Sequence, residues 1–257
     1  MQEITFIQWL VLAFIQGITE YLPISSSAHL ILVSELMGWP DQGLVMDIAA
    51  HGGSLMAVIW FFKEEIIKLF KGKNWELFFQ LSLASIPLAL TGYLFANSIE
   101  QNLRSPIIIA ISSIVFGIFL YISDIIQKKK SDSRGIGYKA AIIIGLSQAF
   151  ALIPGASRSG VTMTAAMLMG FDRIKAAKFS FLLAIPALLM TTAYGGLKLY
   201  KEPSEYNLLG VSVVLIVSFL ASLLSIKLFL NLINKISMAS FMWYRIALGV
   251  LIIGYLQ

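Results

Sequence analysis

Six apolar segments, each long enough to cross a bilayer, constrain this chain more than any other feature of its sequence. They lie at 44–62, 76–96, 106–126, 178–198, 208–230 and 239–256. A membrane-spanning helix needs roughly 20 mostly apolar residues. Of the 257 residues 58% are hydrophobic and 13% charged, whereas soluble domains carry about 25% charged residues. The sequence therefore predicts an all-α polytopic membrane protein, with residues 1–257 as a single integral membrane domain.

Two further apolar segments, 6–37 and 138–171, are broken by proline and by small polar residues. The breaks contain Pro23, Ser25, Ser26 and Ser27 in the first segment and Pro154, Gly155, Ser157, Arg158 and Ser159 in the second. Proline removes a backbone donor and shifts the residue before it out of the helical region. Non-helical backbone at membrane depth is tolerated only where protein buries it or where it lines a wet cavity. Both segments are therefore predicted to be re-entrant helical hairpins.

The positive charges predict how the chain is threaded. Lysine and arginine cluster at 63–73, 128–139, 173–178 and 227–235, and such clusters favour the cytoplasmic side. Tracing the chain then places the first hairpin on the outside and the second on the inside, each followed by three spans. The halves 1–126 and 138–257 thus have opposite topology. Their hairpins also resemble each other, as QGITEYLPISSS and QAFALIPGASRS, which is typical of inverted repeats that build a ligand site.

Composition excludes several kinds of site. The chain has no cysteine and only two histidines, so disulfides, thiolate catalysis and an all-histidine metal cage are excluded. Its net charge of +5 is first a topology signal in a membrane protein. No basic stripe lies outside the membrane-flanking loops, so we expect membrane lipids and not nucleic acid as partners.

The first break carries a carboxylate, hydroxyls and a histidine. Gln16 and Glu20 are four residues apart and share a helix face. An ionisable residue inside an apolar segment marks function by default. Serine favours a helix start, so the N–H groups of a new helix at Ser25, Ser26 or Ser27 would face an anion in the break. His29, in the first turn, is predicted to transfer protons.

The second break carries a cation in the same setting. Arg158 lies between Ser157 and Ser159, and arginine binds phosphate oxygens in a bidentate manner. Gly155 and Gly160 permit close approach of the backbone. With Thr162, these residues complete an anion receptor that also contains a carboxylate.

A carboxylate repels a phosphate unless it binds a bridging cation or activates a nucleophile. The combination therefore predicts phosphoryl transfer from a lipid-borne phosphate to a hydroxyl or to water. Asp47 and His51, beside Gly53 and Ser54, form a second polar group. These residues either belong to the site or anchor the helix at the membrane interface, and the sequence leaves both interpretations open.

Two motifs in the chain resemble the undecaprenyl-diphosphatase family. One is [EQ]-x-x-x-E with its Pro-x-Ser-Ser-x-x-His extension, here Gln16 to His29, and the other is PG-x-SRS-x-x-T, here Pro154 to Thr162. The resemblance implies hydrolysis of undecaprenyl diphosphate to undecaprenyl phosphate and phosphate, recycling of that lipid carrier, and bacitracin resistance. It also implies dependence on a divalent cation, Mg²⁺ or Ca²⁺, and a location in the bacterial cytoplasmic membrane with the site open to the outer face.

Carried over by motif, the resemblance assigns the roles of single residues. Glu20 would be the essential acid and a metal ligand, Ser26 the nucleophile or a close phosphate ligand, His29 the proton-transfer residue and Arg158 the phosphate clamp. The predicted substrate-binding residues are Gln16, Ser25, Ser27, Ser157, Ser159 and Thr162. Gln16 stands where many family members have glutamate.

Three questions stay open at the level of sequence. A transporter or flippase for polyprenyl phosphate is the alternative function, because inverted repeats with broken helices are typical of carriers. A phosphoserine intermediate and direct attack by water both fit the residues. The oligomeric state is also undecided, a homodimer included.

Overall fold

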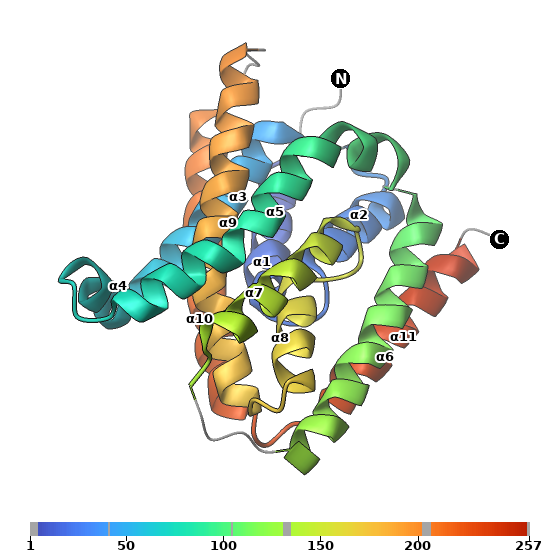
Figure 1. The fold of residues 1–257 in the computed structure, drawn as a ribbon. Coiled ribbons are helices and arrows are strands. Elements are labelled where there is room, and N and C mark those ends of the chain that lie inside the picture. Colours follow the sequence, from blue (N-terminus) through green and yellow to red (C-terminus); the bar gives the residue numbers. More distant parts are fainter. Residues whose placement is uncertain (1–4, 41, 104, 131–134, 202–206, 256–257) are drawn as a thin grey trace.

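Six long helices carry the six apolar segments. The computed structural model describes residues 5–40, 42–103, 105–130, 135–201 and 207–255, and within these ranges it is helical and has no strand (Figure 1). The long helices are α3 (Gly43–Phe61), α5 (Trp75–Asn102), α6 (Pro106–Lys130), α9 (Arg173–Lys201), α10 (Leu208–Leu232) and α11 (Met238–Tyr255). Each contains a stretch long and apolar enough to cross a membrane, which confirms the predicted multi-pass architecture.

The two broken segments fold as helix, break and helix. The first contains α1 (Phe6–Tyr21) and α2 (Ser26–Met37); the second contains α7 (Tyr138–Ser147), the 3-10 turn η1 (Gln148–Leu152) and α8 (Arg158–Leu168). Helix α1 begins with a capping box, in which Thr5 and Gln8 each bond to the other's backbone N–H, so its first donors are satisfied. One further helix, α4 (Lys63–Phe70), forms where the sequence predicted only a charged loop.

The helices pack in matching pairs. Helix α1 lies on α10 as α7 lies on α5, and α3 lies on α10 as α9 lies on α5. Helices α6 and α11 pack against each other at one side of the molecule, on the right of Figure 1. This pairing is compatible with the predicted inverted repeats.

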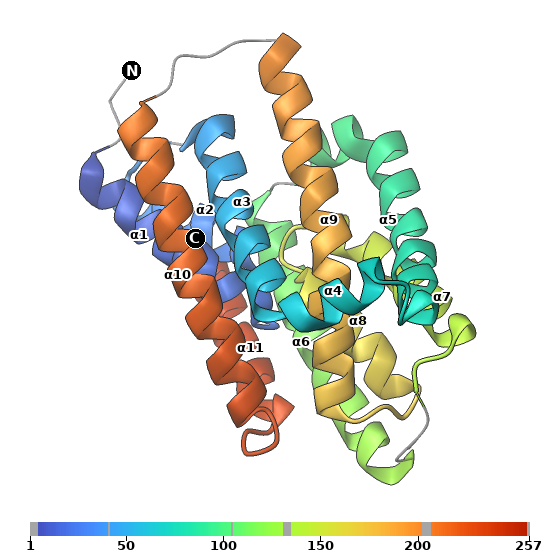
Figure 2. The same ribbon diagram turned by 90° about the vertical axis from the view of Figure 1, so that its left-hand side faces the viewer.

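An ion pair gathers three positively charged segments at one end of the helices. Arg173, the first residue of α9, donates to both carboxylate oxygens of Asp124 in α6, at 2.6 and 2.7 Å. Its Nη1 donates to the carbonyls of Ile233 and Ile236 between α10 and α11. The C-terminal end of α6, which carries Lys128, and the 173–178 and 227–235 segments therefore approach the same end, at the bottom of Figures 1 and 2. Residues 131–134 lie outside the described ranges.

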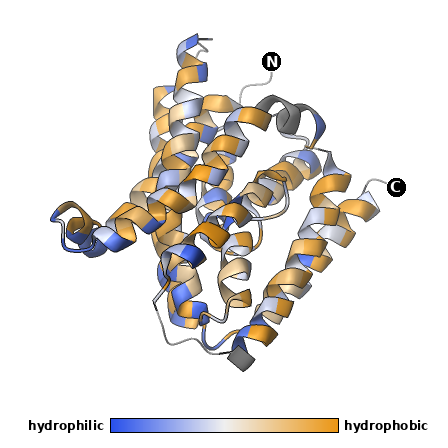
Figure 3. Ribbon diagram, viewed as in Figure 1, coloured by the Kyte–Doolittle hydropathy of each residue, from blue (hydrophilic) through white to orange (hydrophobic). Residues whose placement is uncertain are grey.

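Large apolar side chains cover the outside of the long helices. Trp60, Leu220 and Leu251 are 61, 58 and 66% exposed. Figure 3 shows hydrophobic colour along much of the length of these helices, with hydrophilic residues on α4 and at the lower ends. Exposed apolar surface of this extent is a lipid-facing surface. The polar residues buried within must instead be satisfied by one another.

Arg245 of α11 satisfies the backbone of both breaks. Its side chain is fully buried. Nη1 donates to the carbonyl of Pro23 at 3.2 Å, and Nη2 donates to the carbonyls of Gly155 and Ala156 at 2.7 and 2.9 Å. Nε donates to the carbonyl of Ser113 in α6 at 2.9 Å. One guanidinium thus joins the two hairpins to the α6–α11 pair.

Replacement of Arg245 by methionine is therefore expected to destabilise the whole protein. The apolar stem is kept, but the buried carbonyls of Pro23, Gly155 and Ala156 lose their donor, and an unsatisfied buried polar group costs about 1–3 kcal/mol. We expect the melting temperature in detergent, followed by tryptophan fluorescence, to fall on the order of 10 °C. Trp243→Leu on the exposed face of α11 is the control and should stay near the wild-type value. A melting temperature of Arg245→Met equal to that of the control would contradict this role.

Candidate functional site

The two breaks have the same backbone geometry. Ser25 and Ser157 both have positive φ, 70° and 69°, with ψ of 99° and 112°. Residues without a glycine's freedom rarely adopt this region, and each costs on the order of 1–3 kcal/mol. In each break the serine hydroxyl lies 3.2 Å from that of the serine two residues later, Ser27 or Ser159. Only Ser157 also caps its helix, accepting from the N–H of Gly160.

Close contacts hold the breaks against each other and against α6. Ser159 Oγ donates to the carbonyl of Leu22 in the other break at 2.9 Å. Gly155 has φ of 92°, and a Cβ there would lie 2.2 Å from Oγ of Ser112. That hydroxyl is itself bonded to the carbonyl of Pro154. Only glycine fits position 155, because a side chain would push the second break away from α6.

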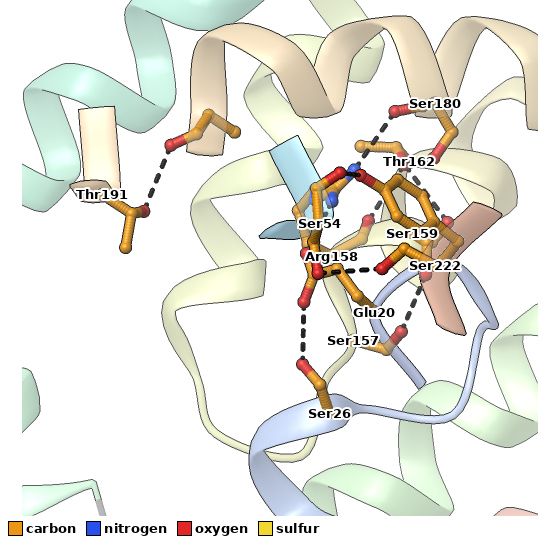
Figure 4. A network of polar contacts seen from close by, with 12 residues as sticks. Glu20, Ser26, Ser54, Ser157, Arg158, Ser159, Thr162, Ser180, Thr191 and Ser222 are labelled. Carbon is orange, nitrogen blue, oxygen red and sulfur yellow. Dashed lines mark hydrogen bonds and ion pairs between the residues drawn. The ribbon is translucent and has the colours of Figure 1, made fainter. Parts of the chain in front are cut away.

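Glu20 collects the polar residues of both breaks at one point (Figure 4). Its Oε1 accepts from Nη2 of Arg158 at 2.8 Å. Its Oε2 accepts from Oγ of Ser26 at 3.0 Å and from Nε2 of Gln16 at 2.9 Å. Ser26 and Arg158 are the first residues of α2 and α8, so both helix starts face this carboxylate.

The second hairpin and α9 hold the guanidinium of Arg158 in place. Nη1 of Arg158 donates to the carbonyl of Ser180 in α9 at 3.2 Å. The Ser180 hydroxyl lies 2.7 Å from that of Thr162. The side chains of Arg158 and Glu20 are only 12 and 8% exposed. A buried ion pair is stable when further hydrogen bonds compensate its desolvation, and both partners have such bonds here.

Two cavities meet at the first break. The smaller, about 210 Å³, lies between the breaks and α9 and is lined by Glu20, Ser25, Ser26, Ser27, His51, Leu88, Ala151, Leu152, Ser157, Arg158, Ala187, Leu188 and Thr191. The larger, about 490 Å³, runs along α2 and the start of α3 and is lined by Gln16, Ser26, Ser27, Leu30, Ile31, Ser34, Glu35, Gly38, Trp39, Gln42, Asp47 and His51. Ser26, Ser27 and His51 line both cavities.

The structure brings most of the predicted site residues together. Seven of them line one or both cavities: Gln16, Glu20, Ser25, Ser26, Ser27, Ser157 and Arg158. Ser159 and Thr162 are fully buried, line neither cavity, and use their hydroxyls within the protein. His29 also lines neither cavity, and its ring lies against Tyr244 of α11.

Gln16 and Glu20 offer oxygens to a divalent cation. Oε1 of Gln16 is buried and has no hydrogen-bond partner within the described part of the chain. It lies on the same side chain whose Nε2 bonds to Glu20. Across the described residues no three acidic or histidine side chains group as a metal cage. A cation that shares its coordination with substrate phosphate needs only one or two protein oxygens, so the residues present fit such a cation.

Comparison with known proteins identifies the family. The family model "Bacitracin resistance protein BacA" matches residues 9–251. The chain belongs to this family. It is 44% identical over 251 residues to an undecaprenyl-diphosphatase of Campylobacter concisus, covering 93% of this chain and 95% of the relative. It is 46% identical over 248 residues to one of Saccharophagus degradans, with 93% of both chains covered.

Two residues of this BacA-family chain were missed or left undecided by sequence reasoning. Arg245 was not selected, although a charged residue within the 239–256 span is itself a signal of function. For His51 the sequence left open whether the side chain reaches the site, because this depends on how α3 packs. In the structure His51 lines both cavities and therefore reaches the site.

Proposed function

We propose that this chain hydrolyses undecaprenyl diphosphate to undecaprenyl phosphate and inorganic phosphate, and that Glu20, Ser26 and Arg158 carry out the reaction. The family and its named relatives give the substrate. The reaction recycles the lipid carrier of envelope polymers, and resistance to bacitracin is associated with the family. The observation that carries the residue assignment is the carboxylate of Glu20, which accepts from the Ser26 hydroxyl and from the Arg158 guanidinium.

Ser26 acts as the nucleophile with Glu20 as its base. The hydroxyl already donates to Oε2 at 3.0 Å, within the range expected of a base and its proton donor. Ser26 Oγ attacks the terminal phosphorus, its proton passes to Glu20, and the bond to undecaprenyl phosphate breaks. Water then attacks the phosphoserine and releases inorganic phosphate. This choice favours the covalent route of the two that the sequence left open.

Arg158 and the two helix starts bind the diphosphate. The guanidinium lines the smaller cavity with Ser25 and Ser157. An arginine can donate to two phosphate oxygens at once, whereas Arg158 here donates to only one carboxylate oxygen of Glu20. A substrate phosphate competes with Glu20 for the guanidinium, which frees Oε1. Charge on the phosphoryl group is then stabilised by donors that are already in place.

A divalent cation, Mg²⁺ or Ca²⁺, would be held by Gln16 Oε1 and Glu20 together with substrate oxygens. When bound, it would neutralise charge on the diphosphate. The support in this chain is the unpartnered Oε1 of Gln16 beside Glu20.

We further propose a location in the cytoplasmic membrane with the site open to the outer face. The support is the approach of three lysine- and arginine-rich segments to one end of the helices, which the positive-inside rule assigns to the cytoplasm.

Ser26→Ala is expected to reduce phosphate release from undecaprenyl diphosphate by about 1,000-fold or more, because loss of a nucleophile removes the covalent route. Purified protein in detergent, with a divalent cation present, gives the measurement. Ser27→Ala is the matched control, since its hydroxyl also lines both cavities but bonds to Ser25 and not to Glu20. Equal losses in the two variants would remove the role assigned to Ser26. A folded wild-type protein that releases no phosphate would favour the lipid carrier instead.

A phosphoserine at Ser26 should be detectable by mass spectrometry when the reaction is stopped with acid within the first turnover. Glu20→Gln should show little of it, because glutamine cannot take the proton. Turnover by the wild type with no phosphorylated Ser26 at any time point would instead establish direct attack by water.

Gln16→Glu is expected to lower the Mg²⁺ or Ca²⁺ concentration that gives half-maximal turnover by about tenfold, because an added carboxylate strengthens an oxygen site. Gln16→Leu removes the unpartnered oxygen and should raise that concentration. A cation dependence that is the same in both variants and the wild type would place the cation elsewhere.

A further inference from the structure

The two histidines of the chain are held in the same way by their own helices. His29 Nδ1 lies 2.7 Å from the carbonyl of Ser25, and His51 Nδ1 lies 2.8 Å from the carbonyl of Asp47. A carbonyl oxygen can only accept, so each ring carries its proton on Nδ1. In the neutral ring Nε2 is then the basic nitrogen. What each histidine can do depends on what its Nε2 faces.

The surroundings of Nε2 separate the two histidines. Nε2 of His29 accepts from the hydroxyl of Tyr244 at 2.5 Å, and the two rings are stacked with an interplanar angle of 3°. The lone pair of His29 is therefore already used, and the ring lines neither cavity of the site. The His51 ring is half-buried, and its Nε2 makes no hydrogen bond in the part of the chain that the structure describes. It lies on the wall of both cavities, as Ser26 does.

Packing of α3 fixes the direction in which His51 points. A Cβ at Gly53 would lie 2.3 Å from the carbonyl of Leu215 in α10, so this face of α3 touches α10 directly. Ser54 Oγ accepts from Ser222 of α10, and the Ser54 carbonyl accepts from the hydroxyl of Tyr21 beside Glu20. Two residues on a helix are about 200° apart, so His51 points away from α10. Small residues thus hold α3 close enough to α1 for His51 to reach the cavity.

The covalent route needs a base in addition to Glu20. In the first step Glu20 takes the proton of Ser26. In the second step the departing Ser26 oxygen takes that proton back. Glu20 is therefore protonated when the attacking water must lose its own proton. A second group with a free lone pair next to Ser26 is required for that transfer.

We infer that His51 is this second base, and that its Nε2 accepts the proton of the water that attacks phosphoserine 26. The inference rests on the proposed function. As the water oxygen bonds to phosphorus, one proton moves to Nε2, the Ser26 Oγ–P bond breaks, and Ser26 regains its proton from Glu20. His51 then passes its proton to the departing phosphate or to water in the larger cavity, which returns the site to its starting state.

Rapid acid quench of His51→Ala tests the assignment with undecaprenyl diphosphate as the probe. The side chain is removed without exposing an unpaired group, because the Asp47 carbonyl lies within α3 and is positioned for the helical backbone bond. We expect phosphoserine to form at nearly the wild-type rate and then to accumulate, while phosphate release slows by about 100-fold or more. Added imidazole should restore part of the release. Thr191→Val is the control, since Thr191 also lines the smaller cavity but bonds to the Ala187 carbonyl of its own helix; it should neither accumulate phosphoserine nor respond to imidazole.

The outcomes separate this inference from the proposed function. Phosphate release by His51→Ala within about threefold of wild type would overturn the role of His51, since general-base catalysis is worth far more. Equal loss of phosphoserine formation and phosphate release would also overturn it, because a base for the second step leaves the first intact. A wild-type protein that releases no phosphate contradicts the proposed function itself, and the inference falls with it.

Discussion

The guanidinium of Arg245 holds this structure together, because it pairs backbone that the two helix breaks leave exposed. A broken helix in a membrane leaves carbonyls without a helical donor, and those that the protein buries must find a donor within it. Arg245 donates to Pro23 in one break and to Gly155 and Ala156 in the other. Since the same group reaches both breaks, it also fixes the distance between them, and the cavity depends on that distance.

The two breaks use one backbone geometry for two kinds of chemistry. Ser25 and Ser157 have nearly identical φ values, 70° and 69°, and the residue after each begins a new helix. That residue is Ser26 in one half and Arg158 in the other. The two similar hairpins therefore place a nucleophile and a cation opposite each other. Glu20 lies in only one of the two hairpins, and in the proposed reaction the proton of Ser26 passes to it.

Much of the site could be predicted because polar residues are costly in an apolar segment and so stand out. Glu20, Ser26 and Arg158 are of this kind, and they are in contact in the structure. The predictions for Ser159 and Thr162 stay untested as substrate contacts, but both hydroxyls bond within the protein. A hydroxyl can bond to nearby backbone, and the sequence does not indicate which serine or threonine will do so.

By itself, the sequence determined the six spans, the two breaks and the family motifs, because span length, proline and local charge are properties of short segments. The tertiary structure decided which of the two histidines faces the cavity, since Tyr244 lies 215 positions from His29 and bonds to it. It also decided the partners of Arg245. These contacts join residues far apart in the chain, and they form only when close-packed small residues bring α1, α3, α10 and α11 to their places.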